Sequence, residues 1–292
     1  MERISNGGLF AEQTAGVRYI SKLYLPFDYP GSKAYAVKRI LPLVPEHRTY
    51  IEPFCGGAAL FFAKKKAEHN WLNDIDEELI NVYATLRDKP ELLAALLGSK
   101  GVSPSVYRCI LYSKPRTEVA RAAKWLYIAL TSYPQTLNLK QNLHKFNESA
   151  HIDLSSATYK LRDVRLTSMD FENVINDAPN GAFLFIDPPY SIRNSKLKRN
   201  TYLHKFSGRD HLRLARALRD RCKEIKFMLF YKENSYVERL FSFDASVSKR
   251  MLVSQIVRQT MKGRKPVAIR ESYKEMVFMN YGKSMAVEHS RK

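Results

Sequence analysis

The sequence predicts an α/β fold: a mostly parallel, Rossmann-like sheet with helices on both faces. Residues 183–186 form an uninterrupted apolar run, which is typical of a strand covered on both faces. A short strand at 49–51 leads through a glycine turn, Gly56-Gly57, into an apolar helix. Strands and helices then alternate over most of the chain, so we expect right-handed crossovers between parallel strands.

Composition narrows the class of protein. The 292 residues are 45% apolar and 12% aromatic, which indicates a packed core rather than disorder. Lys and Arg total 48 against 29 Asp and Glu, and the resulting net charge of +19 favours a polyanionic partner, nucleic acid before acidic membrane. A generally basic, solubilising surface is the alternative that charge alone leaves open.

The sequence indicates neither a membrane segment nor a metal site. It contains no apolar run of about 18 residues, and its start lacks the apolar core of a signal peptide. The three cysteines, Cys55, Cys109 and Cys222, are scattered, which suits a reducing cytoplasm without a disulfide framework. The histidines form no ligand spacing with these cysteines, so we expect no metal.

The first two strand–turn–helix units place candidate ligand groups at strand ends. A Pro-Gly turn leads to Lys33 and a helix expected over 35–41; this lysine can meet a carboxylate there, or it is an ordinary solvated side chain. The turn after 49–51 brings backbone N–H groups close to a ligand. A second strand ends at Asn73-Asp74 before a helix over 75–86, and an acid at this tip is placed to bind ribose hydroxyls.

The alternation of expected strands and helices stops between residues 88 and 160. Helical patterns at 92–97 and 119–130, joined by polar basic loops, predict an inserted, mainly helical subdomain over 88–160. Residues 1–87 and 161–292 then form one discontinuous catalytic domain. Near its end we expect two short strands, over 253–257 and 275–280.

A helix is expected to open at a capping box, Ser207 with Asp210. Leu214 and Leu218 lie on one face of this helix. Arginines at 209, 213 and 216 lie on another face, which we expect to be solvated.

The stretch Asp187-Pro188-Pro189-Tyr190 follows the apolar strand 183–186 directly. Ligands of open α/β sheets bind at the carboxyl ends of strands, so an acid, a proline-fixed carbonyl and an aromatic ring share a binding edge. This set suits a planar amino-heterocycle such as adenine. Asp187 and the Pro188 carbonyl would accept the amino hydrogens and direct the nitrogen lone pair at an electrophile, while Tyr190 stacks on a flipped base. An ordinary strand-to-loop exit with an exposed Asp is the alternative.

The loop after this stretch is basic. Arg193, Lys196, Lys198 and Arg199 lie within seven positions of one another, and they could hold phosphates while a base is extruded. A solvated charged loop is the alternative.

The order of these elements along 27–281 resembles the Dam-like, D12-class adenine-N6 DNA methyltransferases. The resemblance rests on Pro-Gly-Ser-Lys at 30–33, Glu-Pro-Phe-Cys-Gly-Gly at 52–57, Asn-Asp at 73–74, the insert, and Asp-Pro-Pro-Tyr at 187–190. It implies S-adenosylmethionine as the methyl donor, N6 of adenine in duplex DNA as the acceptor, and the insert as target-recognition domain. It also implies a cytoplasmic enzyme encoded by a bacterium, an archaeon or a phage.

The resemblance also assigns roles to residues. Tyr29 and Lys33 would lie near the methionine end of the cofactor, Asp74 would take the ribose hydroxyls, and Asp187 would face both cofactor and target amine. The adenine edge would be read by Asp170 and the Phe171 backbone, and the cradle would be Phe54, Cys55, Gly56 and Gly57. Asp187, Pro188, Pro189 and Tyr190 would form the catalytic motif.

Two departures from the family pattern stand out. Ala58 occupies a position where many members have a second glycine, and we expect this to weaken cofactor binding at most. Residues 133–138 replace segments common in the insert, so the recognised DNA sequence does not follow. Neither a partner restriction endonuclease nor the oligomeric state follows from the sequence.

Three alternatives stay open: the same chemistry on adenine in RNA, the same chemistry on N4 of cytosine, and a DNA-binding protein without catalysis. Asp rather than Ser at position 187 favours adenine by resemblance. The intact motif argues against loss of catalysis.

Overall fold

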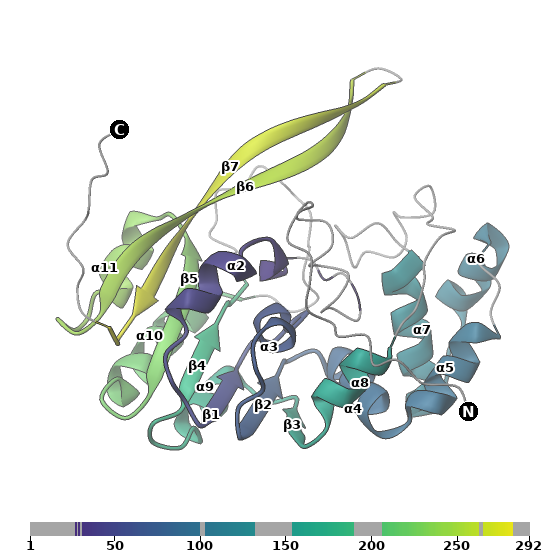
Figure 1. Ribbon diagram of the computed structural model, residues 1–292, viewed down its shortest axis with the longest axis horizontal. Helices are drawn as coiled ribbons and strands as arrows, with labels where there is room; N and C mark the ends of the chain where they lie inside the picture. The colour runs from purple at the N-terminus through teal and green to yellow at the C-terminus, as the bar shows by residue number, and fades with distance from the viewer. Residues whose placement is uncertain are drawn as a thin grey trace, which may run out of the picture.

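A seven-stranded sheet forms the centre of the protein (Figure 1), in the order β3-β2-β1-β4-β5-β7-β6. The computed structural model describes residues 27, 29, 31–99, 103–131, 154–189, 206–262 and 265–282, with 254–273 described by their backbone. The strands are β1 (Thr49–Glu52), β2 (His69–Asn73), β3 (Val164–Thr167), β4 (Phe183–Ile186), β5 (Lys226–Lys232), β6 (Ser248–Lys262) and β7 (Lys265–Met279). Strands β3, β2, β1, β4 and β5 are parallel, and β7 is antiparallel to both β5 and β6. The predicted mostly parallel α/β fold is confirmed.

Both faces of the sheet are buried, which explains why β4 shows no polar alternation. Phe183 and Phe185 pack into an apolar cluster on one face, and Leu184 and Ile186 pack into a second cluster on the other. A strand that is covered twice needs apolar side chains at every position. The apolar run that predicted this strand therefore reflects its central place in the sheet.

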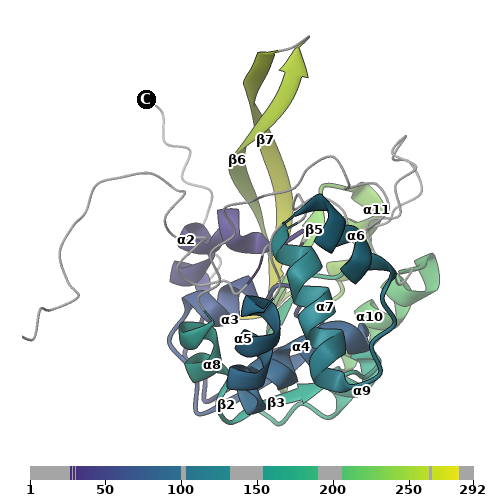
Figure 2. The same ribbon diagram turned by 90° about the vertical axis from the view of Figure 1, so that its right-hand side faces the viewer.

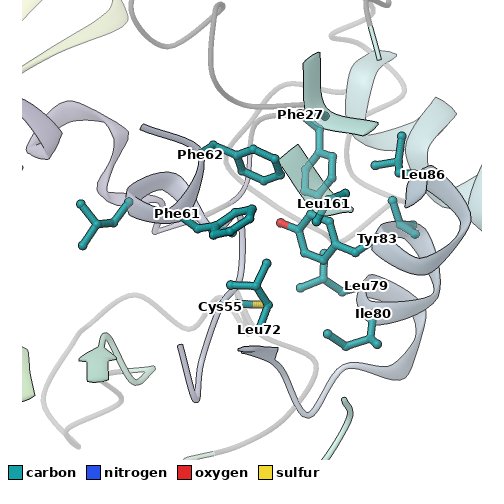
Figure 3. Close-up of a cluster of buried hydrophobic side chains, with 14 of the residues drawn as sticks. Phe27, Cys55, Phe61, Phe62, Leu72, Leu79, Ile80, Tyr83, Leu86 and Leu161 are labelled. Carbon is teal, nitrogen blue, oxygen red and sulfur yellow. The ribbon is translucent and has the colours of Figure 1, made fainter. Parts of the chain in front are cut away.

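Helices cover each face. The helical segments are η1 (Lys33–Tyr35), α2 (Val37–Ile40), η2 (Leu41–Leu43), α3 (Ala59–Ala63), α4 (Glu77–Asp88), α5 (Pro90–Gly98), α6 (Pro104–Tyr112), α7 (Glu118–Thr131), α8 (Ser155–Leu161), α9 (Phe171–Asn176), α10 (Gly208–Arg221) and α11 (Ser235–Phe241). Residues of α9, α10 and α11 belong to one cluster, and residues of α2–α8 belong to the other. Figure 3 shows part of the latter, where Phe62 of α3 and Phe27 lie against Tyr83 of α4.

The helices α5, α6 and α7 pack on the body of the protein. Leu93 of α5, Tyr107 of α6 and Leu126 of α7 share one buried cluster with Tyr83 of α4 and Leu72 of β2. The helices expected at 92–97 and 119–130 are present as α5 and α7, and α6 lies between them in the chain. The division into domains at 88 and 160 stays a prediction, and the segment 133–138 lies outside the described residues.

The hairpin of β6 and β7 is much longer than the two short strands expected from the sequence. Only Glu275–Met279 of β7 pairs with β5, as far as the described register shows, while all of β7 pairs with β6. The remaining ten residues of β7, 265–274, therefore project with β6 as a two-stranded ribbon (Figures 1 and 2). At about 3.4 Å per residue, such a ribbon extends roughly 34 Å. Polar residues at 258–260 and 270–272 interrupt the apolar pattern outside the two expected strands, so the sequence did not indicate the full length of the hairpin.

The start of α10 follows the prediction. The Ser207 backbone N–H donates to the Asp210 carboxylate, and the Ser207 side chain closes the capping box. Leu214 and Leu218 are buried on the face that meets the sheet. No helix in the described part of the chain is both long and apolar enough to cross a bilayer.

Candidate active site

A pocket opens at the carboxyl edge of the parallel strands. Four neighbouring strands each bring one acid to it: Asp170 follows β3, Asp74 follows β2, Glu52 ends β1 and Asp187 follows β4. Because neighbouring strands lie about 4.8 Å apart, these carboxyl groups are spread along the edge rather than gathered at one point. This acid row fits a ligand with several separate polar groups better than it fits a metal ion. Among the described residues, no His, Cys, Asp and Glu side chains are grouped as metal ligands.

All ten residues that the sequence predicted for the cofactor line this pocket. They are Tyr29, Lys33, Phe54, Cys55, Gly56, Gly57, Asp74, Asp170, Phe171 and Asp187. Of the predicted catalytic motif, Pro189 also lines the pocket and Pro188 is buried beside it. Tyr190 lies outside the described residues, as do Arg193, Lys196, Lys198 and Arg199. The structure thus brings the predicted residues together, while their individual roles stay predictions.

The glycine turn after β1 is shaped by a tyrosine ring. A Cβ atom at Gly57 would lie 2.8 Å from Cβ of Tyr29, and one at Gly56 would lie 3.0 Å from its ring. Gly56 also has a φ of 45°, in the left-handed region that glycine favours. The two glycines therefore let Tyr29 close over the turn. Ala58 adopts the same left-handed region, with φ 49° and ψ 39°, where a side chain introduces strain.

Asp74 connects two turns of the pocket. One of its carboxylate oxygens accepts a hydrogen bond from the Gly56 backbone N–H at 2.9 Å, and the other accepts one from the Asp76 N–H at 3.1 Å. These two donors fix the orientation of the carboxylate. A carboxylate has about four acceptor positions, and one that is oriented in this way suits hydroxyl groups of a ligand.

Asn73 is a structural residue whose contribution the sequence analysis missed. Its side chain is fully buried, and its Nδ2 donates to the carbonyls of Pro53 and Met169, each at 2.9 Å. Its Oδ1 accepts from the Met169 N–H and from the Thr167 hydroxyl. Asn73 therefore joins the ends of β1, β2 and β3, and this places Asp74 and Asp170 at the same edge.

Lys33, Asp187 and Glu275 form a buried ion-pair network. The Lys33 ammonium lies 2.7 Å from Asp187 Oδ1 and 3.1 Å from Glu275 Oε1, and the exposed fractions of the three side chains are 4%, 17% and 1%. Burial alone would lower the pKa of Lys33. The charges and hydrogen bonds of Asp187 and Glu275 outweigh that effect and raise the pKa above its usual range. Lys33 is therefore a cation that holds Asp187 at the pocket, and the solvated-lysine alternative is wrong.

Glu52 has a different environment from Asp187, although the two lie on neighbouring strands. It is 1% exposed, and its Oε1 accepts from the Tyr50 hydroxyl at 2.7 Å and from the Phe61 N–H at 3.1 Å. Burial raises the pKa of Glu52 to about 8, against the lowering effect of these two hydrogen bonds and of Lys64. The acid row therefore contains at least one carboxyl group whose pKa burial raises into the neutral range.

Three aromatic rings form the apolar side of the pocket. The centroids of Phe54, Phe171 and Phe206 are 5.2, 5.5 and 5.6 Å apart in pairs, and we call this set the aromatic wall. Phe206 follows a basic loop and gave no signal in the sequence. A wall of this kind suits a planar ring, since aromatic groups pack well against flat apolar surfaces.

Arg213 holds the acids beside the aromatic wall. Its guanidinium donates to Asp170 at 2.6 Å, to Glu172 at 2.7 Å and to Asp210 at 3.1 Å, and it lies 4.8 Å from the centre of the Phe171 ring. Arg209 and Arg216 are exposed, as expected for this helix face. Arg213 is only partly exposed and pairs with the three acids, because α9 and α10 pack side by side. Asp170 is also the N-cap of α9.

The fold and the pocket define an α/β protein of the Rossmann-like class, whose site combines an oriented strand-tip acid, a glycine turn, an aromatic wall and a buried ion-pair network. A sequence model of the D12 class N6 adenine-specific DNA methyltransferases matches residues 29–104 and 113–259. The chain belongs to this family of adenine-specific DNA methyltransferases, and the predicted family is confirmed.

Named relatives are similar over most of the chain. The type II methyltransferase M1.LlaDCHI of Lactococcus lactis subsp. cremoris is 28% identical over 88% of this chain and 95% of its own length. The type II methyltransferase M.MjaIII of Methanocaldococcus jannaschii is 25% identical over 88% of this chain and 99% of its own. The DNA N-6-adenine-methyltransferase of Escherichia phage P1 is 26% identical over 66% of this chain and 28% of its own.

Proposed function

We propose that this protein transfers the methyl group of S-adenosylmethionine, bound in the pocket at the carboxyl edge, to N6 of a flipped adenine at a short specific sequence in duplex DNA. The observation that carries the proposal is the ion pair of Lys33 and Asp187 at this edge, 2.7 Å apart and mostly buried. The neighbouring ammonium favours the ionised form of Asp187, the first residue of the Asp-Pro-Pro-Tyr motif, beside the other predicted cofactor residues.

The residues of the pocket fit S-adenosylmethionine by their chemistry. Asp74 presents a carboxylate that two backbone N–H groups orient, which suits the hydroxyls of a ribose. The aromatic wall suits the purine, and Asp170 lies beside it as an acceptor for the amino group. Bound there, the cofactor would supply an electrophilic methyl group on its sulfonium sulfur.

Asp187 would act on the acceptor. The exocyclic nitrogen of adenine is a poor nucleophile because its lone pair is delocalised into the ring. An ionised carboxylate and the Pro188 carbonyl would accept its two hydrogens and direct the lone pair at the methyl group. Lys33 supports this role by favouring the ionised form of Asp187. Lys33 contacts two carboxylates of the protein, those of Asp187 and Glu275. Holding Asp187 is therefore a better fit for Lys33 than binding the methionine carboxylate of the cofactor.

DNA binding is proposed to depend on the basic loop that carries Arg193, Lys196, Lys198 and Arg199. The positive charges of these four side chains support this proposal, and so does the net charge of +19 of the whole chain. Replacing Lys196, Lys198 and Arg199 together should weaken binding to all duplexes alike and flatten its salt dependence by roughly one counterion per lost contact. An unchanged salt dependence of DNA binding would show that the loop is a solvated surface that does not contact phosphates.

The test is methyl transfer from isotopically labelled S-adenosylmethionine to duplex DNA, followed by digestion and mass spectrometry of the nucleosides. We expect labelled N6-methyladenine at sites that long-read sequencing maps to one short motif. A duplex with 2-aminopurine at the target should brighten on binding, as the base leaves the stack. Labelled N4-methylcytosine, or label in RNA but not in DNA, would overturn the proposed acceptor. DNA binding without any transfer would support the alternative of lost catalysis.

A further inference from the structure

Glu275 is a buried acid that neither the motif nor the proposed chemistry accounts for. It lies on β7 opposite Lys232 of β5, where the projecting hairpin joins the sheet. Its two oxygens take different partners: Oε1 lies 3.1 Å from the Lys33 ammonium, and Oε2 accepts from the Tyr35 hydroxyl at 2.8 Å. With 1% of its side chain exposed, Glu275 interacts with the protein interior rather than with solvent.

Charge balance alone gives no reason for a second acid at this point. Lys33 and Asp187 already form a neutral pair, and burying another carboxylate is costly unless a specific contact compensates for it. Glu275 contacts Lys33 from a different strand than Asp187 does, so the ammonium is held from two directions. The Phe230 ring of β5, centred 5.5 Å from the ammonium, borders the same space.

We propose that Glu275 is a positioning residue for the reaction: it holds Lys33, and through Lys33 the carboxylate of Asp187, in the orientation that methyl transfer needs, while Tyr35 orients Glu275. The inference rests on the proposed function. Glu275 would contact neither cofactor nor base, and it would act only through Lys33.

The charged and titratable neighbours determine how pH should reveal this role. Among the described residues, Lys33 faces Asp187 from β4 and Glu275 from β7. Tyr35 faces Glu275, and Glu52 and Tyr231 lie near Asp187. Two negative charges favour the protonated form of Lys33. Removing one of them lowers its pKa, so Lys33 should lose its proton at a lower pH.

Glu275→Gln keeps the size of the side chain, removes its charge and replaces one of its two acceptor oxygens by an NH2 donor. We expect kcat to fall about tenfold or more, with KM for cofactor and DNA within about twofold. We also expect the alkaline limb of the kcat–pH profile to move to lower pH. Glu275→Asp keeps the charge on a shorter stem, so it should lower kcat but leave the alkaline limb near that of the wild type.

Tyr35→Phe removes the hydroxyl that orients Glu275 and should lower kcat to a smaller extent. Thermal unfolding shows whether Glu275→Gln folds. If it does not fold, the Tyr35→Phe variant serves as the test in its place. Glu233→Gln is the matched control, because Glu233 is an exposed acid just after β5 and its change should leave kcat and the pH profile as they are.

Two outcomes separate the inference from the function on which it rests. A wild-type protein that methylates adenine, together with folded Glu275→Gln and Tyr35→Phe variants of unchanged kcat and pH profile, would overturn the positioning role alone. A wild-type protein that transfers no methyl group would overturn the proposed function. A fall in kcat with an unmoved alkaline limb would reduce Glu275 to a packing residue and overturn the inference.

Discussion

The ion-pair network and the aromatic wall line the same pocket, but the fold holds them in different ways. The network joins Lys33 to residues 154 and 242 positions further along the chain, and two of its three side chains are at most 4% exposed. The wall consists of apolar rings braced from outside by Arg213, whose side chain is 37% exposed. The buried side is charged and rigidly paired, whereas the apolar side is supported near the surface. This difference predicts that changes in the network mainly affect turnover and changes beside the wall mainly affect affinity.

The largest effect is expected at Asp187. Asp187→Ala removes the proposed acceptor for an amino hydrogen of adenine, so turnover should fall roughly 10²–10⁴-fold, the range of a positioned acid or base. DNA affinity should change far less, because most of it comes from phosphate contacts. Single-turnover methylation and DNA titration measure the two. Asp177→Ala, at an exposed acid after α9, is the control, and a near wild-type rate for Asp187→Ala would contradict the role of the network.

Asp74 tests the acid row between the network and the wall. Asp74→Asn keeps an oxygen for the Gly56 N–H but removes the charge of the acceptor that we propose for ribose hydroxyls. Hydrogen bonds to charged groups contribute about 1.5–3 kcal/mol, so affinity for S-adenosylmethionine should fall roughly 10- to 100-fold. Isothermal titration calorimetry measures this directly. Unchanged affinity would remove Asp74 from the cofactor site.

Glu52 tests whether a buried carboxyl that forms no ion pair among the described residues behaves differently from Asp187. Its folded-state pKa is raised from 4.5 to about 8, chiefly by burial. Between these values the folded protein holds a proton that the unfolded chain has released, so stability falls as pH rises through this window.

Glu52→Gln removes that penalty. It should gain at least about 1 kcal/mol relative to wild type between pH 5 and pH 9, measured as the difference in thermal unfolding. A difference that does not change with pH would show that Glu52 is ionised in the folded protein.

Arg213 tests the bracing of the aromatic wall. Arg213→Met keeps an apolar stem over Phe171 and releases Asp170, Glu172 and Asp210. Because the arginine is partly exposed, we expect only about 0.5–1 kcal/mol of cofactor affinity to be lost, or two- to fivefold. Turnover at saturating cofactor should persist. Arg216→Met, on an exposed part of α10, should have no effect on either quantity. A loss of turnover in Arg213→Met as large as that in Asp187→Ala would contradict the predicted difference between the ion-pair network and the aromatic wall.

The smallest effect is expected at Ala58. Its left-handed backbone strains an alanine, while a glycine there gains freedom in the unfolded chain, and the two effects partly cancel. Ala58→Gly should therefore stabilise the protein by about 0.5 kcal/mol and leave cofactor affinity within twofold. Ala129→Gly, in the interior of α7, should instead destabilise it by about 0.5–1 kcal/mol. Thermal unfolding measures both changes in stability. A destabilised Ala58→Gly variant would show that the turn tolerates its alanine without strain.

The sequence predicted those parts of the protein whose signal is local. Buried parallel strands read as apolar runs, and the motifs at their ends could be placed at one edge because parallel strands share a direction. The partners of the motif residues could not be predicted in this way. Glu275 reaches Lys33 and Tyr35 only through the sheet order. Arg213 meets Asp170 only because α9 and α10 lie side by side, and Phe206 stands beside no motif. The raised pKa of Glu52 depends on burial, which a single acid in a sequence does not reveal.

The late position of β7 in the chain has a consequence for biosynthesis. The acid row is complete once β4 has left the ribosome, since its last member is Asp187. Glu275 follows 88 positions later, and it reaches Lys33 only after β7 has inserted beside β5. Non-local pairings of this kind form late, because the intervening chain must first be synthesised and closed. A nascent or C-terminally cleaved chain that ends before β7 therefore contains every motif of the family and still lacks the complete ion-pair network.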